Sequence, residues 1–324
     1  MKLNMKLKAT AKSIKLAASI IKNGGLVAFP TETVYGLGAD ALNPRAIAKI
    51  FKIKKRPTFD PLIVHIAEME WLHKLTRQVD ERTLTLIKKF WPGPLTLVLL
   101  KSSLVPDIVT AGLDTVAVRM PAHPVARKFI KLSQTPIAAP SANLFGHLSP
   151  TTVAHVEKQL GKKIDLILDA GKCPVGVEST VLSLVGGKPV LLRPGGLPLE
   201  EIEKVIGKVV RQSKTKTIQS PGQLQSHYSP RTPMKLFKSL NQIPLNNNVG
   251  VLLFKRPVLK IKARTVEILS EKGDLTEAAA NLFLALHRLD ESGVKIIYAE
   301  CIPAVGLGSA IMDRLERASS KSAT

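Results

Sequence analysis

Residues 26–38 read LVAFPTETVYGLG, and they set the architecture of the chain. The apolar run from Leu26 to Phe29 predicts a short buried strand that ends at Pro30. Polar residues and glycines follow at once, and a loop that contains glycine lets backbone N–H groups approach a ligand. A plain turn between two elements would have much the same sequence, so these residues alone leave both interpretations open.

Outward from this strand, helical spacing and strand-like runs alternate irregularly. The pattern predicts helices over 12–22, 44–54 and 79–90. It predicts further strands over 61–66, 95–100, 115–119 and 136–139. The mixed pattern of helices and strands continues over 151–160, 165–169, 179–185 and 188–192. Irregular alternation of this kind is typical of an α/β fold built on a twisted, mixed sheet.

The composition changes near residue 211, where a polar and basic stretch with several prolines begins. Such a stretch predicts a linker. Beyond it, the pattern predicts strands over 249–254 and 295–299 and helices over 275–292 and 308–318. We therefore predict three parts, which are a first α/β domain over 1–211, a linker over 212–233, and a small βαβ, Rossmann-like domain over 234–324.

Basic residues outnumber acidic ones by 47 to 25, so the chain carries a net charge of +22. This excess predicts attraction to anions such as nucleotides, phosphates and RNA, and it does not choose among them. Aromatic residues make up only 4% of the chain, which disfavours an RNA-binding surface built on base stacking.

Several familiar signatures are missing from the sequence. It contains no P-loop, dinucleotide fingerprint, HExxH motif or nucleophile elbow, and Cys173 and Cys301 have no metal-ligand spacing. We therefore expect no metal site made by the protein alone. The basic start, Met1–Lys6, precedes no signal-peptide core, and no apolar run reaches about 18 residues. We expect a short frayed tail, no membrane span and a cytoplasmic protein.

A basic cluster lies at the end of the second predicted helix. Residues 45–56 hold six basic side chains and no acidic one, and Lys54 and Arg56 fall where the helix gives way to Pro57. On an exposed loop, these two cations would suit a triphosphate, because arginine offers a fork of donors and lysine a point charge. A solvated basic helix end, which also suits the helix dipole, explains the same pattern.

Polar groups also follow other predicted strands. Arg119 ends one strand and is placed to pair with a carboxylate, whereas Ser141 and Asn143 follow another and suit phosphate or nucleotide groups. Glycine-flanked polar residues recur at 176–180 and 192–196, where they predict close approach of the backbone to a ligand. Local turn chemistry explains each segment singly. Their recurrence at strand ends of one domain favours a shared anion pocket.

Taken together, these segments resemble the YrdC-type threonylcarbamoyl-AMP synthase family. The matching strings are PTETVYGLGADA (30–41), KKRPTFDPLIVHI (54–66), FWPGPLTLVL (90–99), VAVRMPAHPVA (116–126), APSANLFGHLSPTT (139–152), GVESTV (176–181) and LLRPGG (191–196). The C-terminal GDLTEAAANLFLALHRLDESG and PAVGLGSAIMDRLERA resemble the extra domain of the long, two-domain members, and SPGQLQSHYSP (220–230) resembles their linker.

Two positions depart from the family's pattern. The family often has glycine at position 55, where this chain has Lys55, and asparagine at position 60, where it has Asp60. An acid at position 60 would weaken a contact with the nucleotide or would meet a metal ion instead.

The resemblance implies a YrdC-like fold with helices around a large basic concave pocket. The residues that it implies around L-threonine are Thr33, His65, Arg119, Ala139 and Ser179, with Arg119 taking the carboxylate. Those that it implies around ATP are Lys54, Arg56, Asp60, Thr110, Ser141, Asn143, Ser149, Arg193 and Tyr228. Within the second set, Lys54 and Arg56 are the implied catalytic pair, and Tyr228 would reach the nucleotide from the linker as part of a lid.

The implied reaction is that of a nucleotidyltransferase. L-Threonine, bicarbonate and ATP, with Mg²⁺ held mainly by the ATP phosphates, give threonylcarbamoyl-AMP and pyrophosphate for the t6A37 modification of tRNA. The implied partners are the downstream tRNA threonylcarbamoyl transferase machinery and, through a weak contact, RNA. Such chemistry needs positioning and charge neutralisation more than a protein nucleophile. Two other hypotheses stay open, an RNA-binding module that uses the basic cleft and a regulatory protein that keeps the pocket without catalysis.

Overall fold

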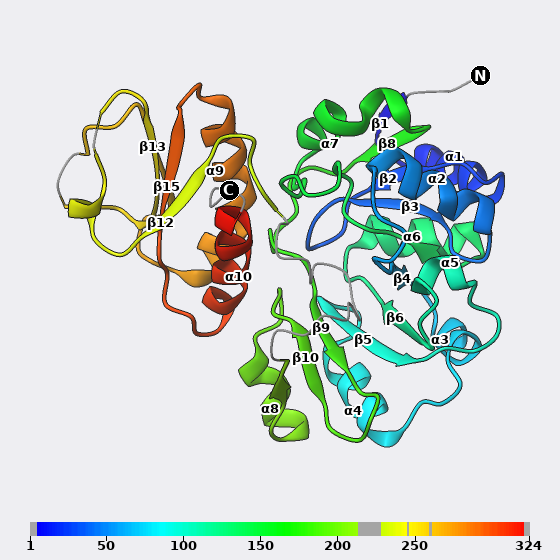
Figure 1. Ribbon diagram of the computed structural model, residues 1–324. Helices are drawn as coiled ribbons and strands as arrows, with labels where there is room; N and C mark the ends of the chain where they lie inside the picture. Colours follow the sequence, from blue (N-terminus) through cyan, green and yellow to red (C-terminus); the bar gives the residue numbers. More distant parts are fainter. Residues whose placement is uncertain (1–4, 213–227, 245, 259–260, 321–324) are drawn as a thin grey trace.

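The computed structural model describes residues 5–212, 228–244, 246–258 and 261–320. Figure 1 shows two α/β units side by side, each made of a sheet and its helices. We call the unit that contains the N-terminus the large layer, and the smaller unit from the C-terminal part of the chain the small or second layer. The large layer holds an 11-stranded sheet and the small layer a 4-stranded sheet. The predicted α/β class with a mixed sheet and a smaller second α/β unit is confirmed.

The large sheet mixes parallel and antiparallel neighbours in the order β1-β8-β2-β3-β7-β4-β6-β5-β9-β10-β11. For example, β2 pairs antiparallel with β3 and parallel with β8. Its strands are β1 Met5–Lys8, β2 Val27–Phe29, β3 Gly36–Asp40, β4 Ile63–His65, β5 Leu95–Leu100, β6 Thr115–Arg119, β7 Ile137–Ala138, β8 Leu166–Asp169, β9 Thr180–Ser183, β10 Val190–Arg193 and β11 Val210–Arg211.

Strand alternation gives this sheet two apolar faces. In β2, Val27 and Phe29 pack with α1 and α6 on one face, whereas Ala28 belongs to the cluster that α2 joins on the other. Helices cover both faces, which explains why the central strands are apolar throughout. The helices of this layer are α1 Ala11–Lys22, α2 Pro44–Lys54, α3 Met69–Leu75, α4 Glu81–Phe90, α5 Asp107–Thr110, α6 Pro124–Ser133, α7 Val153–Leu160, the 3₁₀ turn η1 Gly161–Lys163 and α8 Leu199–Ile206.

The small sheet is parallel throughout, in the order β12-β15-β13-β14. Its long helix begins at the predicted N-cap, Asp274, whose carboxylate accepts a hydrogen bond of 2.7 Å from the backbone N–H of Glu277. The elements are β12 Met234–Phe237, the 3₁₀ turn η2 Leu240–Gln242, β13 Val249–Lys255, β14 Thr265–Ser270, α9 Leu275–Glu291, β15 Ile296–Glu300 and α10 Leu307–Ser319. Helices α9 and α10 face the large layer (Figure 1).

The start of the chain differs from the prediction of a frayed tail. Residues 1–4 lie outside the described part, but Met5–Lys8 form β1, an edge strand parallel to β8. Met5 and Leu7 pack against the cluster under α1 and α6, and this alternation of apolar and lysine side chains is a strand signal that the charge obscured. The predicted linker, 212–233, falls largely on residues outside the described part, so the predicted domain boundaries stay a prediction.

A glycine explains how closely the two layers pack. Gly176 has a φ of +77°, and a Cβ placed on it would lie 2.3 Å from the carbonyl oxygen of Ala279 in α9. Its backbone therefore approaches a helix of the second layer, whereas the sequence had predicted approach to a ligand. One apolar cluster accordingly joins Val34 and Val177 of the large layer to Phe283 of α9.

No helix within the described ranges is long and apolar enough to cross a membrane.

Candidate functional site

The candidate site is a partly open cavity at the ends of several strands of the large sheet. Its volume is about 50 Å³. The lining residues are Thr31, Thr33, Val34, Gly36, Arg56, Ile63, His65, Arg119, Ala139, Pro140, Ser141, Glu178, Ser179, Arg193 and Tyr228.

The five residues predicted around threonine all line this cavity. His65 and Arg119 are the last residues of the parallel strands β4 and β6, and they stand directly opposite each other in register. Thr33 follows β2, Ala139 follows β7, and Ser179 precedes β9. The structure therefore brings together residues that lie far apart in the sequence, although their role in binding threonine stays a prediction.

Arg119 is held rigidly inside the cavity wall. Its guanidinium donates to Thr33 Oγ1 at 3.0 Å, to Gly93 O at 3.1 Å and to Glu32 Oε1 at 2.6 Å. Burial alone would raise the pKa of Glu32, but Arg119 outweighs that effect and holds this pKa below its usual value. Glu32 therefore holds the guanidinium of Arg119 in position. No pattern in the sequence indicated this role for Glu32.

His65 is neutral at ordinary pH. Burial, followed by the charge of Arg119, lowers the pKa of His65 to about 3. Among the described residues its Nδ1 is buried without a hydrogen-bond partner. A neutral imidazole beside a cationic fork suits a ligand that carries both a carboxylate and a hydroxyl group.

Lys54 and Arg56 are buried, and the expectation of an exposed loop is wrong for both. The Lys54 ammonium donates to Ser141 O at 2.6 Å and to Asn143 O. Arg56 forms an ion pair with Asp60, with 2.8 Å between Nη2 and Oδ1, and donates to Pro61 O at 2.8 Å. The two side chains fold inward because backbone carbonyls accept hydrogen bonds from them and the carboxylate of Asp60 offsets the charge of Arg56.

The two departures from the family pattern have structural explanations. Lys55 ends α2 in the left-handed region, with φ 54° and ψ 37°, where glycine costs less than any other residue. Asp60 pairs with Arg56 inside the protein. Its carboxylate therefore lies against Arg56, and the two alternatives that the sequence suggested for Asp60, a weakened nucleotide contact and a metal ligand, stay predictions.

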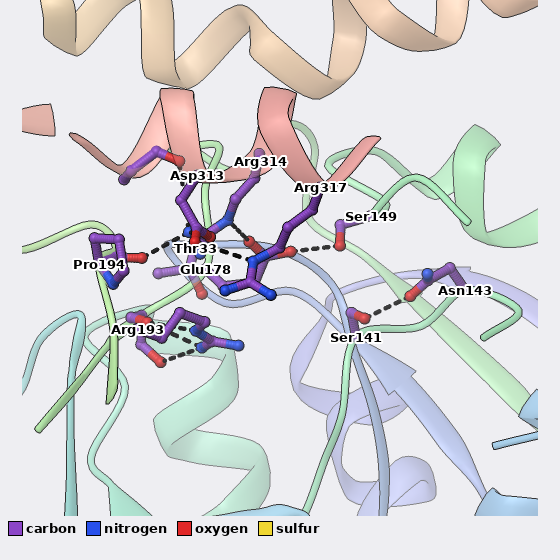
Figure 2. Close-up of polar contacts among 12 residues, drawn as sticks. Thr33, Ser141, Asn143, Ser149, Glu178, Arg193, Pro194, Asp313, Arg314 and Arg317 are labelled. Atoms are coloured by element: carbon purple, nitrogen blue, oxygen red, sulfur yellow. Dashed lines mark hydrogen bonds and ion pairs between the residues drawn. The ribbon is translucent and has the colours of Figure 1, made fainter. Parts of the chain in front are cut away.

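The remaining residues predicted around ATP do not all reach the cavity. Ser141, Arg193 and Tyr228 line it, and Asn143 accepts a hydrogen bond from Ser141 (Figure 2). Ser149 stands behind the wall, where its hydroxyl donates to Glu178. Thr110 lies on α5 and is not among the lining residues, and Lys101 Nζ lies 3.5 Å from its Oγ1. Residues 213–227 lie outside the described part, so the structure describes only residues 212 and 228–233 of the predicted linker and lid.

The second layer contributes a fully buried arginine that the sequence analysis missed. Figure 2 shows Arg314 reaching from α10 toward Glu178 and Pro194. Its Nε donates to Glu178 Oε2 at 2.9 Å, and its Nη1 donates to Pro194 O at 2.6 Å. Its Cζ lies 5.1 Å from the centroid of the Tyr228 ring. One side chain of the C-terminal unit thus contacts three segments that form the cavity wall.

Two histidines stack across the same interface. The rings of His155 in α7 and His287 in α9 have centroids 3.7 Å apart. Burial, followed by His287, lowers the pKa of His155 to about 3, and burial also lowers the pKa of His287. Both rings are therefore neutral in the folded protein at ordinary pH.

Acid should weaken the folded state through these histidines. An unfolded histidine binds a proton below about pH 6.5, whereas His155 resists protonation down to about pH 3. The free energy of unfolding therefore falls as pH drops through this window, by up to about 1.4 kcal/mol per pH unit for each such group. We expect the urea midpoint of His155→Gln to fall less steeply with decreasing pH than that of the native protein. The midpoint of His73→Gln, which changes an exposed residue, should fall as steeply as that of the native protein. Equal slopes for native protein and His155→Gln would contradict this expectation.

Within the described ranges, no group of three or more His, Cys, Asp or Glu side chains could hold a metal ion.

A mixed sheet whose strand ends enclose a cationic cavity, with a second α/β unit packed against it, defines an α/β protein built to bind a small anionic ligand. Residues 19–195 match the Sua5/YciO/YrdC family model, described as "Telomere recombination". Residues 197–320 match the model described as "Threonylcarbamoyl-AMP synthase, C-terminal domain". The chain therefore belongs to the Sua5/YciO/YrdC family, in its two-domain form, which confirms the resemblance seen in the sequence.

Relatives match nearly the whole chain. It is 46% identical to the threonylcarbamoyl-AMP synthase of Pyrococcus abyssi over 333 residues, which cover 98% of this chain and 97% of that protein. It is 44% identical to that of Bacillus subtilis, with 94% and 92% covered. The crystal structure of P. abyssi Sua5 complexed with L-threonine matches with a TM-score of 0.90 and 44% identity, and the match covers 98% of this chain and 97% of that one.

Proposed function

We propose that this protein is an enzyme, a threonylcarbamoyl-AMP synthase that acts as a nucleotidyltransferase. It converts L-threonine, bicarbonate and ATP into threonylcarbamoyl-AMP and pyrophosphate. The observation that carries the proposal is one cavity in which buried Arg119 and neutral His65 adjoin the cations of Arg56 and Arg193. The names of the relatives and the L-threonine in the P. abyssi structure support it.

Threonine binds on the Arg119 side of the cavity. The guanidinium takes the carboxylate of the amino acid, and Glu32 and Thr33 hold that guanidinium in place from behind. Because its ring stays neutral, His65 either accepts a hydrogen bond from the threonine hydroxyl or donates one to it. This arrangement leaves the amine directed toward the cationic side, where bicarbonate and ATP meet it.

The chemistry begins on that amine. The deprotonated amine attacks bicarbonate carbon, water leaves, and a carbamate forms. A carbamate oxygen then attacks the α-phosphorus of ATP, and the bond to the bridging oxygen of pyrophosphate breaks. Arg56, Arg193 and Lys54 stabilise the added negative charge at this step, and no protein nucleophile is required. Closure of the site by the second layer excludes water, which protects the labile adenylate.

Magnesium accompanies ATP in this proposal. The described residues offer no cluster of metal ligands of their own. Asp60, the one acid among the residues predicted around ATP, forms an ion pair with Arg56. The ion is therefore held mainly by the phosphates, where it neutralises part of their charge. The product passes to the machinery that transfers the threonylcarbamoyl group to tRNA for the t6A37 modification.

ATP binding should take up a proton through Lys54. Burial, followed by the charge of Arg56, lowers the pKa of Lys54 well below its usual value. A triphosphate beside the amine favours its charged form and raises this pKa again. We expect ATP affinity to fall as pH rises, with proton uptake seen by calorimetry in buffers of different ionisation enthalpy. Lys54→Met should lose the proton uptake, whereas the control Lys52→Met, at an exposed residue, should keep it. Proton uptake that survives in Lys54→Met would show that another group takes up the proton.

Pyrophosphate release tests the function directly. ATP and Mg²⁺ are supplied, and L-threonine and bicarbonate are each added or withheld. Release that requires both supports the synthase. A folded protein that releases none under any combination would refute the proposal and favour the regulatory or RNA-binding hypothesis.

A further inference from the structure

The outer face formed by α1 and α6 carries basic side chains and no acidic ones. The two helices pack against each other, with Ile14, Ala17 and Phe129 in one apolar cluster beneath them. Neither helix contains an Asp or Glu residue. We call this outer surface the α1–α6 face; its exposed cations are Lys12, Lys15, Lys22, Arg127, Lys128 and Lys131.

The cations lie on one stripe of each helix. At 100° per residue, Lys12, Lys15 and Lys22 fall within about 80° of one another around α1. The stripe runs for about 15 Å, since ten residues separate its ends and each adds about 1.5 Å. On α6, Arg127, Lys128 and Lys131 fall within about 100° of one another. The outcome is two adjacent rows of positive charge on a rigid surface.

Most of this charge is not neutralised within the protein. Lys131 pairs with Glu68 at 2.9 Å, and Lys22 donates to the amide oxygen of Gln134. For Lys12, Lys15, Arg127 and Lys128, the described part of the chain provides no ion pair. Charges that repel one another on one face lower stability slightly, so a polyanion that binds there gains affinity by relieving the repulsion.

The chemistry of the face favours a nucleic-acid backbone over other anionic partners. The exposed large apolar side chains of the described residues are Phe59, Leu84, Leu100, Leu104, Val210, Val258 and Val305, and none of them lies on α1 or α6. A membrane surface would call for apolar anchors beside the lysines, and a protein interface for an apolar centre. Phosphodiester contacts need only cations, and they read no sequence.

We propose that the α1–α6 face binds the phosphate backbone of a folded RNA. The face is separate from the catalytic cavity, since no residue of either helix lines it. The proposal goes beyond the proposed function and does not depend on it. Binding is sequence-independent and steeply salt-dependent, and it keeps the enzyme near RNA while the cavity stays free for small substrates.

A pair of charge-reversal variants tests the proposal. The first combines Lys12→Glu, Lys15→Glu and Lys128→Glu on the α1–α6 face. The control combines Lys88→Glu, Lys89→Glu and Lys188→Glu, which are exposed residues on α4 and in the loop between β9 and β10. Both change the net charge equally, so a difference between them reports position. The probe is an unmodified tRNA transcript, with affinity measured by fluorescence anisotropy across a series of KCl concentrations.

We expect the first variant to bind the tRNA at least about tenfold more weakly than the native protein. The slope of log Kd against log[KCl] should also fall by about 2 to 3, because each lost phosphate contact lowers this slope by about 0.9. The control should change affinity by less than about threefold. Pyrophosphate release should persist in both, which separates this test from that of the proposed function. Equal losses in both variants, or no tRNA binding by the native protein at low salt, would overturn the proposal. Loss of binding to phosphatidylglycerol vesicles with tRNA binding intact would overturn it in favour of a membrane surface.

Discussion

Arg56→Ala should reduce pyrophosphate release by at least about a hundredfold, because loss of one preorganised donor to a transition-state charge costs about 10²–10³ in rate. Arg56 is a lining residue of the cavity. The rate is measured with saturating L-threonine and bicarbonate, so that the effect falls on the step that involves ATP. Arg45→Ala serves as the matched control, since Arg45 is exposed at the other end of α2.

Stability will change along with activity, because Arg56 is buried with Asp60. Removing one partner of a buried ion pair leaves the other charge uncompensated and costs about 3–5 kcal/mol. The double variant Arg56→Ala/Asp60→Asn removes both charges and should recover part of the stability without recovering the rate. Full activity in a folded Arg56→Ala protein would show that Arg56 serves the fold alone. Recovery of the rate in the double variant would assign the defect to the stranded carboxylate.

Arg314→Met should have the second largest effect, although Arg314 lies outside the domain that holds the cavity. This substitution breaks the buried ion pair between Arg314 and Glu178, and we expect the free energy of unfolding to fall by about 3–5 kcal/mol. Glu178 lines the cavity, and Pro194 follows the lining residue Arg193. We therefore also expect the KM for ATP to rise more than the KM for threonine at temperatures where the variant is folded.

A weaker contact across the same interface provides the control. Lys158 of α7 and Glu291 of α9 form an ion pair of 2.6 Å, and about half of each side chain is exposed. Because exposed pairs contribute only about 0–1 kcal/mol, Lys158→Ala should leave both stability and the KM for ATP nearly unchanged. Equal effects of Lys158→Ala and Arg314→Met would mean that any loss of docking impairs the site. An unchanged KM for ATP in Arg314→Met would restrict Arg314 to a role in stability.

The strands and the class of fold were predictable because their signals are local. Apolar runs predicted β2, β4, β5, β6 and β7, but not the central strand β3, because Gly36 and Gly38 indicated a loop. Strand alternation places Val27 and Ala28 on opposite faces of the sheet. Helices α6 and α8 were not predicted, although Pro124 opens α6 at its first position. The proposed roles of the site residues stay predictions. The structure adds that the residues predicted around threonine share one cavity and that Thr110 does not line it.

The sequence by itself determined the order of the elements, the polar residues at the strand ends, the excess of positive charge and the family. Only the tertiary structure decided which charges are buried. Arg314 and Arg317 stand three residues apart on one helix, yet Arg314 is fully buried against Glu178 while Arg317 remains partly exposed beside Asp313. Lys54 and Lys55 are neighbours, and one is buried while the other caps the helix in solvent. Burial depends on which distant surfaces meet, and spacing along the chain does not encode that by any local rule.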